Sequence, residues 1–391
     1  MFSFYMPSHL YIGEGSLKKL SEIDIPGSKG LIVTTSGKSV KKYGYLNRVQ
    51  AFLEIQGVKT IVYDKANANP TSKGVMEGAK IARENNCDII IGLGGGSAID
   101  TAKCIAAMAV NPGDLWDYIE SGTGKNKMLQ NNPLPIIAIP TTSGTGTEAD
   151  PWAVTTNERT KEKIDFGNDK TFPCISIVDP ELMMTVPKKL SVYQGFDALF
   201  HSTEGFIAAA ANPISDALAI KAIELIAKYL PRAAADGNDR EARSNMAVAS
   251  TISGIVESIS NCTSEHSIEH ALSGFHPDLP HGAGLIAICI AYYEKFLDIS
   301  KDKYIIMAKA MGEDIEEYSD DKKQYAFISA LKKLQLSCGT ANIRLSDYGV
   351  ESEKIGQYAK SAYDTMGELF DMDPRRLSFD ETCEIIEKSL K

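Results

Sequence analysis

The sequence has no long uncharged apolar run. A helix that crosses a bilayer needs about 20 consecutive, predominantly apolar residues, and the best stretch here, Leu285 to Tyr293, is far shorter. The first residues carry neither a basic start nor a sustained apolar run, unlike a secretory signal peptide. We therefore expect no transmembrane helix, no export signal and no membrane partner.

Cysteine is scarce and shows no pattern. The chain has 7 cysteines, an odd number, and none stands in a Cys-x-x-Cys pair. This arrangement disfavours both a disulfide framework and a thiolate zinc site. We expect each cysteine to be a small buried hydrophobic residue, and we expect the protein in the reducing cytoplasm.

Positive charge is also in deficit. The 41 lysines and arginines are outnumbered by 51 aspartates and glutamates, for a net charge of −10, and no basic block stands out. Nucleic acids and anionic membrane surfaces are therefore excluded as partners. With 391 residues, 43% of them hydrophobic, the chain is long enough for two domains with their own cores.

The two halves of the chain differ in hydrophobic pattern. In residues 1–185, short β-branched apolar runs alternate with helical patterns, which favours a parallel sheet covered on both faces. In residues 186–391 the strand pattern disappears and helical periodicity dominates. The sequence therefore predicts a Rossmann-like α/β domain followed by an all-α domain. Expected strands are 30–35, 60–64, 87–93, 135–139 and 174–178; expected helices are 46–56, 74–86, 97–110, 213–230, 240–259, 282–297, 322–336 and 381–391.

A glycine turn joins one of these strands to the next helix. The strand ends at Leu93, Gly94–Gly96 follow, and a helical pattern starts at once. Glycines let backbone N–H groups approach a phosphate, and a helix N-terminus adds partial positive charge. Ser97 is placed to cap this helix, with Asp100 at the acidic position of a capping box. The alternative is a tight turn without a ligand.

A second loop follows another apolar strand. Residues 140–148 contain Thr141, Thr142 and further small polar residues. Ligands of open α/β sheets bind at the carboxyl ends of the strands, where both loops are expected to lie. Two such loops on one sheet favour a dinucleotide over a small anion.

Five of the six histidines lie between His201 and His281. Asp197 and His201 are four residues apart, as are His266 and His270, so each pair shares a helix face. An oxygen ligand with several imidazoles suits Fe²⁺ or Zn²⁺ better than Ca²⁺ or Mg²⁺. The alternative is two unrelated helices with partly buried polar residues, and spacing alone does not choose between His266 and His270.

Taken together, these motifs resemble the iron-containing alcohol dehydrogenase family, which includes lactaldehyde reductases, 1,3-propanediol dehydrogenases and butanol dehydrogenases. The match rests on the glycine turn, the loop at 140–146, Gly195-x-Asp197-Ala-Leu-x-His201 and the block from His266 to Pro280-His281-Gly282. The resemblance implies a dehydroquinate synthase-like architecture. It assigns dinucleotide binding to residues 1–185 and metal and substrate binding to residues 186–391.

The resemblance also implies roles for single residues. Asp197, His201, His266 and His281 would be the metal ligands, and His270 would lie beside the nicotinamide as a catalytic residue. Lys163 would face the cofactor, although a solvated charge is an equal alternative. The residues expected to bind the cofactor are Gly37, Ser39, Gly94, Gly95, Gly96, Ser97, Asp100, Thr141, Thr142 and Lys163.

The chain departs from the family pattern in two places. After the second proposed ligand it has Ser202-Thr203-Glu204-Gly205 where the family usually has Ala-Ile-Glu-Ala. The stretch 274–280 is one residue longer than its common counterparts and includes His276, which we expect to be an exposed loop residue, with a fifth metal ligand as the alternative. The large apolar residues that either line the substrate pocket or belong to the core are Trp152, Phe196, Phe200 and Phe275.

The implied activity is hydride transfer between NAD(P)(H) and a small primary alcohol or aldehyde, with one Fe²⁺ or Zn²⁺ polarising the substrate oxygen. A homo-oligomer, most simply a dimer, is expected. One alternative is a metal-dependent lyase or cyclase of the dehydroquinate synthase type, which needs a basic pocket that the sequence does not show near its histidines. Glycerol dehydrogenase-like polyol oxidation and a non-enzymatic binding module are the others.

The coenzyme prediction rests on the end of the first expected strand. NAD-selective sites usually place an acidic residue there against the ribose 2′-hydroxyl. Here Thr35 is followed by Ser36-Gly37-Lys38-Ser39, without an acid. The sequence therefore predicts NADP(H) over NAD(H), although Asp64 at the end of the next strand could serve NAD.

Overall fold

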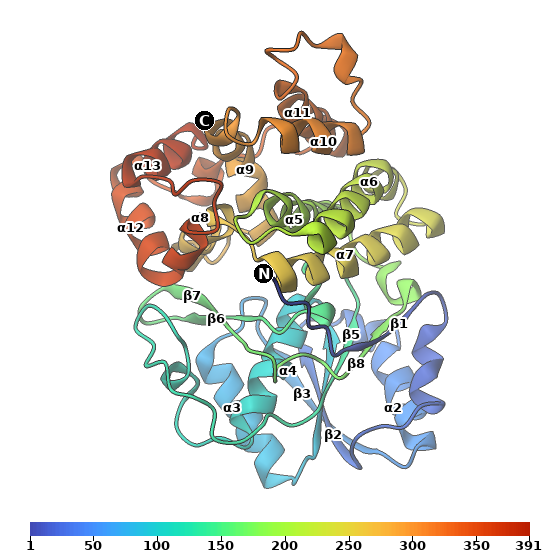
Figure 1. Ribbon diagram of the computed structural model, residues 1–391. Coiled ribbons are helices and arrows are strands. Elements are labelled where there is room, and N and C mark those ends of the chain that lie inside the picture. Colours follow the sequence, from blue (N-terminus) through green and yellow to red (C-terminus); the bar gives the residue numbers. More distant parts are fainter. The chain divides into compact units, whose positions relative to one another are not determined.

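The computed structural model describes residues 1–391, which form two compact units (Figure 1). One unit comprises Tyr5–Val186, and the other comprises Pro187–Lys391 together with Met1–Phe4. The first contains every strand of the structure, and the second is helical. None of the helices combines the length and apolarity needed to cross a membrane.

A six-stranded parallel sheet forms the centre of the first unit, in the order β1-β8-β5-β4-β2-β3. The predicted α/β class with a parallel sheet is confirmed. The strands of this sheet are β1 (His9–Ile12), β2 (Lys29–Thr35), β3 (Lys59–Ala66), β4 (Ile89–Gly94), β5 (Ile136–Pro140) and β8 (Ile175–Val178).

Helices cover both faces of the sheet because its central strands are apolar on both sides. Every residue of β4 is buried. On one face, Ile91 packs with Val49 and Leu53 of α2 (Tyr45–Ile55). On the other, Ile90 packs with α3 (Ser72–Glu84) and α4 (Gly96–Met108). The short helix α1 (Ser39–Lys42) precedes α2.

The strand order creates a switch point between β2 and β4. From β2 the chain moves outward to β3, then returns to β4 on the other side and continues to β5. Loops at the carboxyl ends of the strands flanking such a point form the ligand-binding crevice of open α/β sheets. The segments after Thr35 and Gly94 therefore meet at the same edge.

An antiparallel hairpin in the first unit was not predicted. It pairs β6 (Ala153–Asn157) with β7 (Glu162–Phe166). Its strands are short and rich in threonine and charged residues, so they lack the apolar run that marks the strands of the parallel sheet. The hairpin contacts α4, which follows the glycine turn.

The second unit is a helical assembly around one large apolar core. Its first long helix carries two of the predicted ligands, and Asn212 caps the next with Pro213 at the first position. That helix continues through Pro231, beyond the predicted end at 230. The helices are α5 (Lys188–Ile207), α6 (Pro213–Ala235), α7 (Arg240–Ser260), α8 (Ser264–Phe275), α9 (His281–Tyr293), α10 (Lys301–Ala310), α11 (Tyr325–Cys338), α12 (Ile355–Met366) and α13 (Phe379–Lys388).

Candidate functional site

The glycine turn leaves backbone donors uncapped at the start of α4. Gly95 precedes the helix in extended conformation, and no side chain caps it. The predicted cap at Ser97 is wrong, because Ser97 already lies inside the helix and its hydroxyl donates to the carbonyl of Ala68. The first N–H groups of α4 therefore keep the arrangement that binds a phosphate.

The loop after β5 packs directly on this turn. The backbone N–H of Thr141 donates to the carbonyl of Gly94 over 2.8 Å. A Cβ at Gly96 would lie 2.6 Å from Cγ2 of Thr145, and one at Gly95 would lie 3.1 Å from Oγ1 of Thr142. Glycine is therefore required by close packing of the two loops, which places Thr142 beside the turn.

Asp100 turns into the protein instead of capping α4. It accepts hydrogen bonds from Oγ1 of Thr147 (2.8 Å) and from the N–H of Val154 (3.2 Å). Burial raises the pKa of Asp100 to about 7, although the nearby Lys103 opposes the shift. The capping-box role predicted for Asp100 is wrong, since this carboxyl belongs to a buried cluster below the turn.

Lys103 forms the centre of that cluster and is fully buried. Its Nζ donates to Oγ1 of Thr147 (2.7 Å), to the carbonyl and a carboxylate oxygen of Asp150 (both 2.9 Å), and to the carbonyl of Trp152 (2.7 Å). The cluster thereby ties α4 to the segment that follows the second loop.

The remaining predicted cofactor residues differ in exposure. Gly37 and Ser39 are exposed beside the end of β2. Asp64 lies inside β3, where a hydrogen bond from Lys41 lowers its pKa. Lys163 lies in β7 and is 6% exposed, so the alternative of a solvated charge is wrong.

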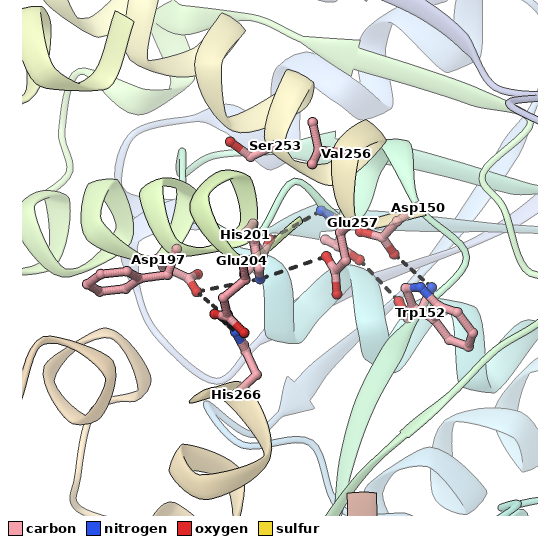
Figure 2. A network of polar contacts seen from close by, with 12 residues as sticks. Asp150, Trp152, Asp197, His201, Glu204, Ser253, Val256, Glu257 and His266 are labelled. Carbon is pink, nitrogen blue, oxygen red and sulfur yellow. Dashed lines mark hydrogen bonds and ion pairs between the residues drawn. The ribbon is translucent and has the colours of Figure 1, made fainter. Parts of the chain in front are cut away.

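Three helices of the second unit bring a carboxylate and three imidazoles together. Asp197 and His201 share a face of α5, His266 lies in the first turn of α8, and His281 begins α9 (Figure 2 shows the first three). Asp197 Oδ1 lies 3.2 Å from Nε2 of His281 and 3.7 Å from Nε2 of both His201 and His266. The four predicted ligands therefore converge on one point.

The local sequence explains the position of His281. Pro280 precedes it and starts α9, and Gly282 follows. A Cβ at Gly282 would lie 2.2 Å from the carbonyl oxygen of Tyr193 on α5. Only glycine lets the start of α9 approach α5 this closely, which brings His281 against Asp197.

Two carboxylates behind the imidazoles orient them. Oε1 of Glu204 lies 2.5 Å from Nδ1 of His266, and Oε2 of Glu269 is hydrogen-bonded to Nδ1 of His281. Such contacts fix the ring and leave Nε2 available to a metal. The sequence prediction did not include either role, although Glu204 lies one turn after His201 on the same helix face.

The electrostatics of the cluster suit a cation. Burial acts to raise the pKa of Asp197, but the imidazoles around it hold that pKa well below its usual range. Burial lowers the pKa of His201 to about 4, so its ring is neutral at pH 7. Asp197 Oδ1 and His266 Nε2 are buried without a hydrogen-bond partner. An ionised carboxylate, the neutral ring of His201 and these orphaned atoms fit a divalent metal ion.

Neighbouring histidines have other contacts. Nδ1 of His270 lies 3.0 Å from Sδ of Met366, although His270 also groups with Glu269 and His281 as potential ligands. His276 is half-buried, and its Nε2 lies 2.9 Å from the hydroxyl of Tyr358. The prediction of an exposed loop residue at 276 is wrong because this hydroxyl holds the ring.

The proposed pocket aromatics separate into two groups. Phe196 and Phe200 are fully buried in the apolar core of the helical unit. Phe275 packs against the same core and is half-buried, as is Trp152 in the first unit. The first two are therefore core residues and do not line a pocket.

Known proteins share both halves of this chain. The model of the iron-containing alcohol dehydrogenase family matches residues 7–180, and that of the C-terminal domain of the same family matches residues 191–390. Alcohol dehydrogenase 4 of Schizosaccharomyces pombe is 40% identical over 296 residues, covering 75% of this chain and 68% of its own. The NAD-dependent methanol dehydrogenase of Bacillus methanolicus is 32% identical over all of both chains.

A solved structure superposes on this chain over its full length. An alcohol dehydrogenase from a halo-thermophilic archaeon of a Red Sea brine pool superposes with a TM-score of 0.93 at 35% identity, covering 100% of this chain and 99% of that one. The family models, the relatives and the convergent Asp-His cluster lead to one conclusion. The chain belongs to the iron-containing alcohol dehydrogenase family and is a metal-dependent oxidoreductase acting on alcohols.

Proposed function

We propose that Asp197, His201, His266 and His281 hold one divalent metal ion in this enzyme. The observation that carries the proposal is the convergence of three Nε2 atoms on Asp197 Oδ1 within a buried site. Three imidazoles and one carboxylate leave room for substrate oxygen at the ion. When bound, the ion supplies Lewis-acid chemistry at that oxygen, and a nicotinamide coenzyme exchanges hydride with the carbon.

The protein's own residues position these reactants. Glu204 and Glu269 hold His266 and His281 by Nδ1, so their Nε2 atoms keep one direction throughout turnover. Burial of Asp197 and His201 keeps bulk water away from the donor atoms. This lowers the local dielectric and strengthens the charge interactions that catalysis uses.

Alanine variants test the ligand assignment. We expect His266→Ala and His281→Ala to lose iron and aldehyde reduction together, because each removes a direct ligand. His270→Ala should retain iron and lose turnover, and His276→Ala should retain both. Iron per subunit after anaerobic loading and the reduction rate are measured on the same preparations. Loss of iron in His270→Ala with retention in His266→Ala would exchange the roles of these two residues.

For His270 we propose proton transfer between the substrate oxygen and solvent. The contact of its Nδ1 with Met366 Sδ fits a proton at Nδ1, which leaves Nε2 as the basic nitrogen. The pH–rate profile of His270→Gln tests this role. We expect the limb of the profile that reports this proton transfer to disappear, whereas an unchanged profile at a lower rate would reduce His270 to a packing residue.

The substrate class is a small primary alcohol or its aldehyde. The family assignment disfavours the lyase or cyclase alternative and the polyol oxidation of glycerol dehydrogenase. Oxidation of reduced coenzyme with a panel of short aldehydes, read by absorbance, tests the class. Turnover with phosphorylated acidic substrates but not with aldehydes would refute it.

We further propose that the coenzyme is NADP(H). The segment after β2 is exposed and has no acid, and Asp64 on the neighbouring strand is engaged by Lys41. A 2′-phosphate therefore meets basic and small residues instead of a free carboxylate. Comparison of kcat/KM for NADPH and NADH tests this, and a ratio in favour of NADH refutes it.

Three further proposals concern the bound metal, the oligomeric state and the cellular compartment. We propose that the enzyme uses Fe²⁺ in preference to Zn²⁺, that it forms a homodimer, and that it is located in the cytoplasm. All seven cysteines are free, which fits a reducing compartment. Elemental content after anaerobic purification, light scattering and fractionation of the source cells test the three statements.

A further inference from the structure

Cys262 places a sulfur atom beside the histidine cluster. It lies in the turn between α7 and α8 and is 5% exposed. The potential ligand atoms of Cys262, His201 and His266 all lie within 4.8 Å of one another. Among the seven cysteines, only this one belongs to a group of potential metal ligands. The expectation that every cysteine is merely a small hydrophobic residue therefore does not cover Cys262.

The chain on both sides of this sulfur is held in place. Asn261 has a φ of 61°, which turns the backbone sharply after α7. Thr263 donates to Glu204 from its N–H (2.8 Å) and its hydroxyl (2.7 Å), and Ser264 donates its N–H to Asp373 (3.1 Å). The position of the thiol is thus fixed by neighbours that also support the ligands.

Two donor sets consequently share the same imidazoles. Both sets contain His201 and His266. The first set also contains the oxygen of Asp197 and the ring of His281. The second set also contains the sulfur of Cys262. Glu204 holds Nδ1 of His266, so the Nε2 of that ring serves one ion at a time. Oxygen-rich sets suit Fe²⁺, whereas a thiolate with imidazoles favours Zn²⁺.

We propose that His201, Cys262 and His266 form a second zinc position that excludes the catalytic ion. The inference rests on the proposed ligand set, because two of the three donors are shared. A Zn²⁺ ion there forms a bond to sulfur and displaces the thiol proton to solvent, and no electrons are transferred. Zinc in this position leaves Asp197 and His281 without a shared metal, so the enzyme is inactive.

Cobalt(II) is the probe that reports sulfur ligation directly. Asp197→Asn replaces the anionic oxygen donor of the first set with a neutral, weaker amide donor of the same shape. We expect this variant to bind cobalt with a near-ultraviolet thiolate-to-cobalt charge-transfer band. Adding Cys262→Ser should abolish the band and weaken cobalt binding by more than about 100-fold, because losing a direct ligand costs more than losing a residue that only orients one. Cys338→Ser, equally buried at 5% exposure, is the matched control and should leave the band intact.

Zinc inhibition of the two cysteine variants, each with Asp197 retained, provides the second measurement. Relative to Cys338→Ser, we expect Cys262→Ser to need at least about 10-fold more zinc for half-inhibition of the iron-loaded protein. Equal zinc sensitivity, bound cobalt without a charge-transfer band, or no cobalt binding in Asp197→Asn overturns the inference. Failure of the proposed catalytic centre is seen separately, as full iron content and activity in Asp197→Asn.

Discussion

Two buried ionic clusters, one in each unit, differ in how their charges are balanced. In the α/β unit the ammonium of Lys103 is surrounded by oxygen atoms of Thr147, Asp150 and Trp152 at 2.7–2.9 Å. In the helical unit the carboxylate of Asp197 faces only imidazoles, the nearest at 3.2 Å. The first cluster contains a permanently charged ammonium at hydrogen-bonding distance, whereas the second offers Asp197 only imidazoles that can be neutral or charged.

The difference separates a structural cluster from a ligand site. Buried charges are tolerated when partners satisfy them, and Lys103 meets this condition within the protein. Asp197 Oδ1 and His266 Nε2 are buried without a hydrogen-bond partner, and a bound divalent ion would satisfy both. Unpartnered buried atoms that come from a carboxylate and an imidazole at one place therefore support the proposed metal site.

The largest expected effect comes from neutralising the carboxylate of the second cluster. Asp197→Asn should lower aldehyde reduction at least about 1000-fold, which is about 4 kcal/mol of activation free energy. Iron content should fall with it, because the remaining imidazoles carry no negative charge. Iron analysis and steady-state rates measure both. A variant that is active without iron would show that the Asp197 cluster is structural, like the cluster around Lys103.

Removing the cation of the first cluster should destabilise the fold. Lys103→Met leaves Asp150 buried without its partner, which costs about 3–5 kcal/mol. Urea unfolding measures the loss, and iron per folded subunit should be unchanged. Lys65→Met is the control, since its ion pair with Glu77 is exposed and screened by solvent, so its loss should hardly change stability. Similar losses in both variants would contradict a structural role for Lys103.

Removing the metal should affect only the second cluster. When free ion is at about 100 times its dissociation constant, it stabilises the native state by about 2.7 kcal/mol. Chelation should therefore lower the thermal transition of the helical unit, as followed by calorimetry. The destabilisation caused by Lys103→Met should add to this loss if the two clusters, which belong to different units, act independently. An unchanged transition after complete chelation would contradict the ligand set.

A smaller effect is the pH dependence of stability that Asp100, in the cluster around Lys103, should cause. The pKa of Asp100 is about 7 in the native protein and 3.8 as its ordinary value, so the native state binds more protons between these pH values. Stability therefore falls as pH rises through this window. Asp100→Asn should lack this dependence. Its free energy of unfolding should therefore rise by about 2 kcal/mol relative to that of the native protein between pH 5 and 6.5. Parallel urea midpoints for the two proteins would refute the shift.

Strong local patterns made much of the architecture predictable. The run ending at Leu93, followed by glycines, predicts the β4–turn–α4 unit because apolar strands and glycine turns are local signals. The i, i+4 spacing likewise placed Asp197 and His201 on one helix. The prediction for α6 stopped at 230 because Pro231 usually ends a helix, whereas here the helix continues to Ala235.

Features that depend on tertiary contacts were not predictable in the same way. Ser97 and Asp100 fit a capping box by sequence, but Gly95 occupies the cap and Asp100 bonds to Thr147 from the distant second loop. Lys163 has the sequence context of a solvated lysine and is nevertheless buried. Cys262 has no motif, and its importance depends on the position where the turn into α8 is held.

The origin of all four proposed ligands in one unit governs how long an ion stays bound. Asp197, His201, His266 and His281 belong to α5, α8 and α9, all within Pro187–Lys391. We expect the coenzyme to bind at the sheet of the other unit, so its arrival and release should break no coordination bond. We therefore expect metal exchange to require local opening of the helical unit, so that one ion serves many catalytic cycles.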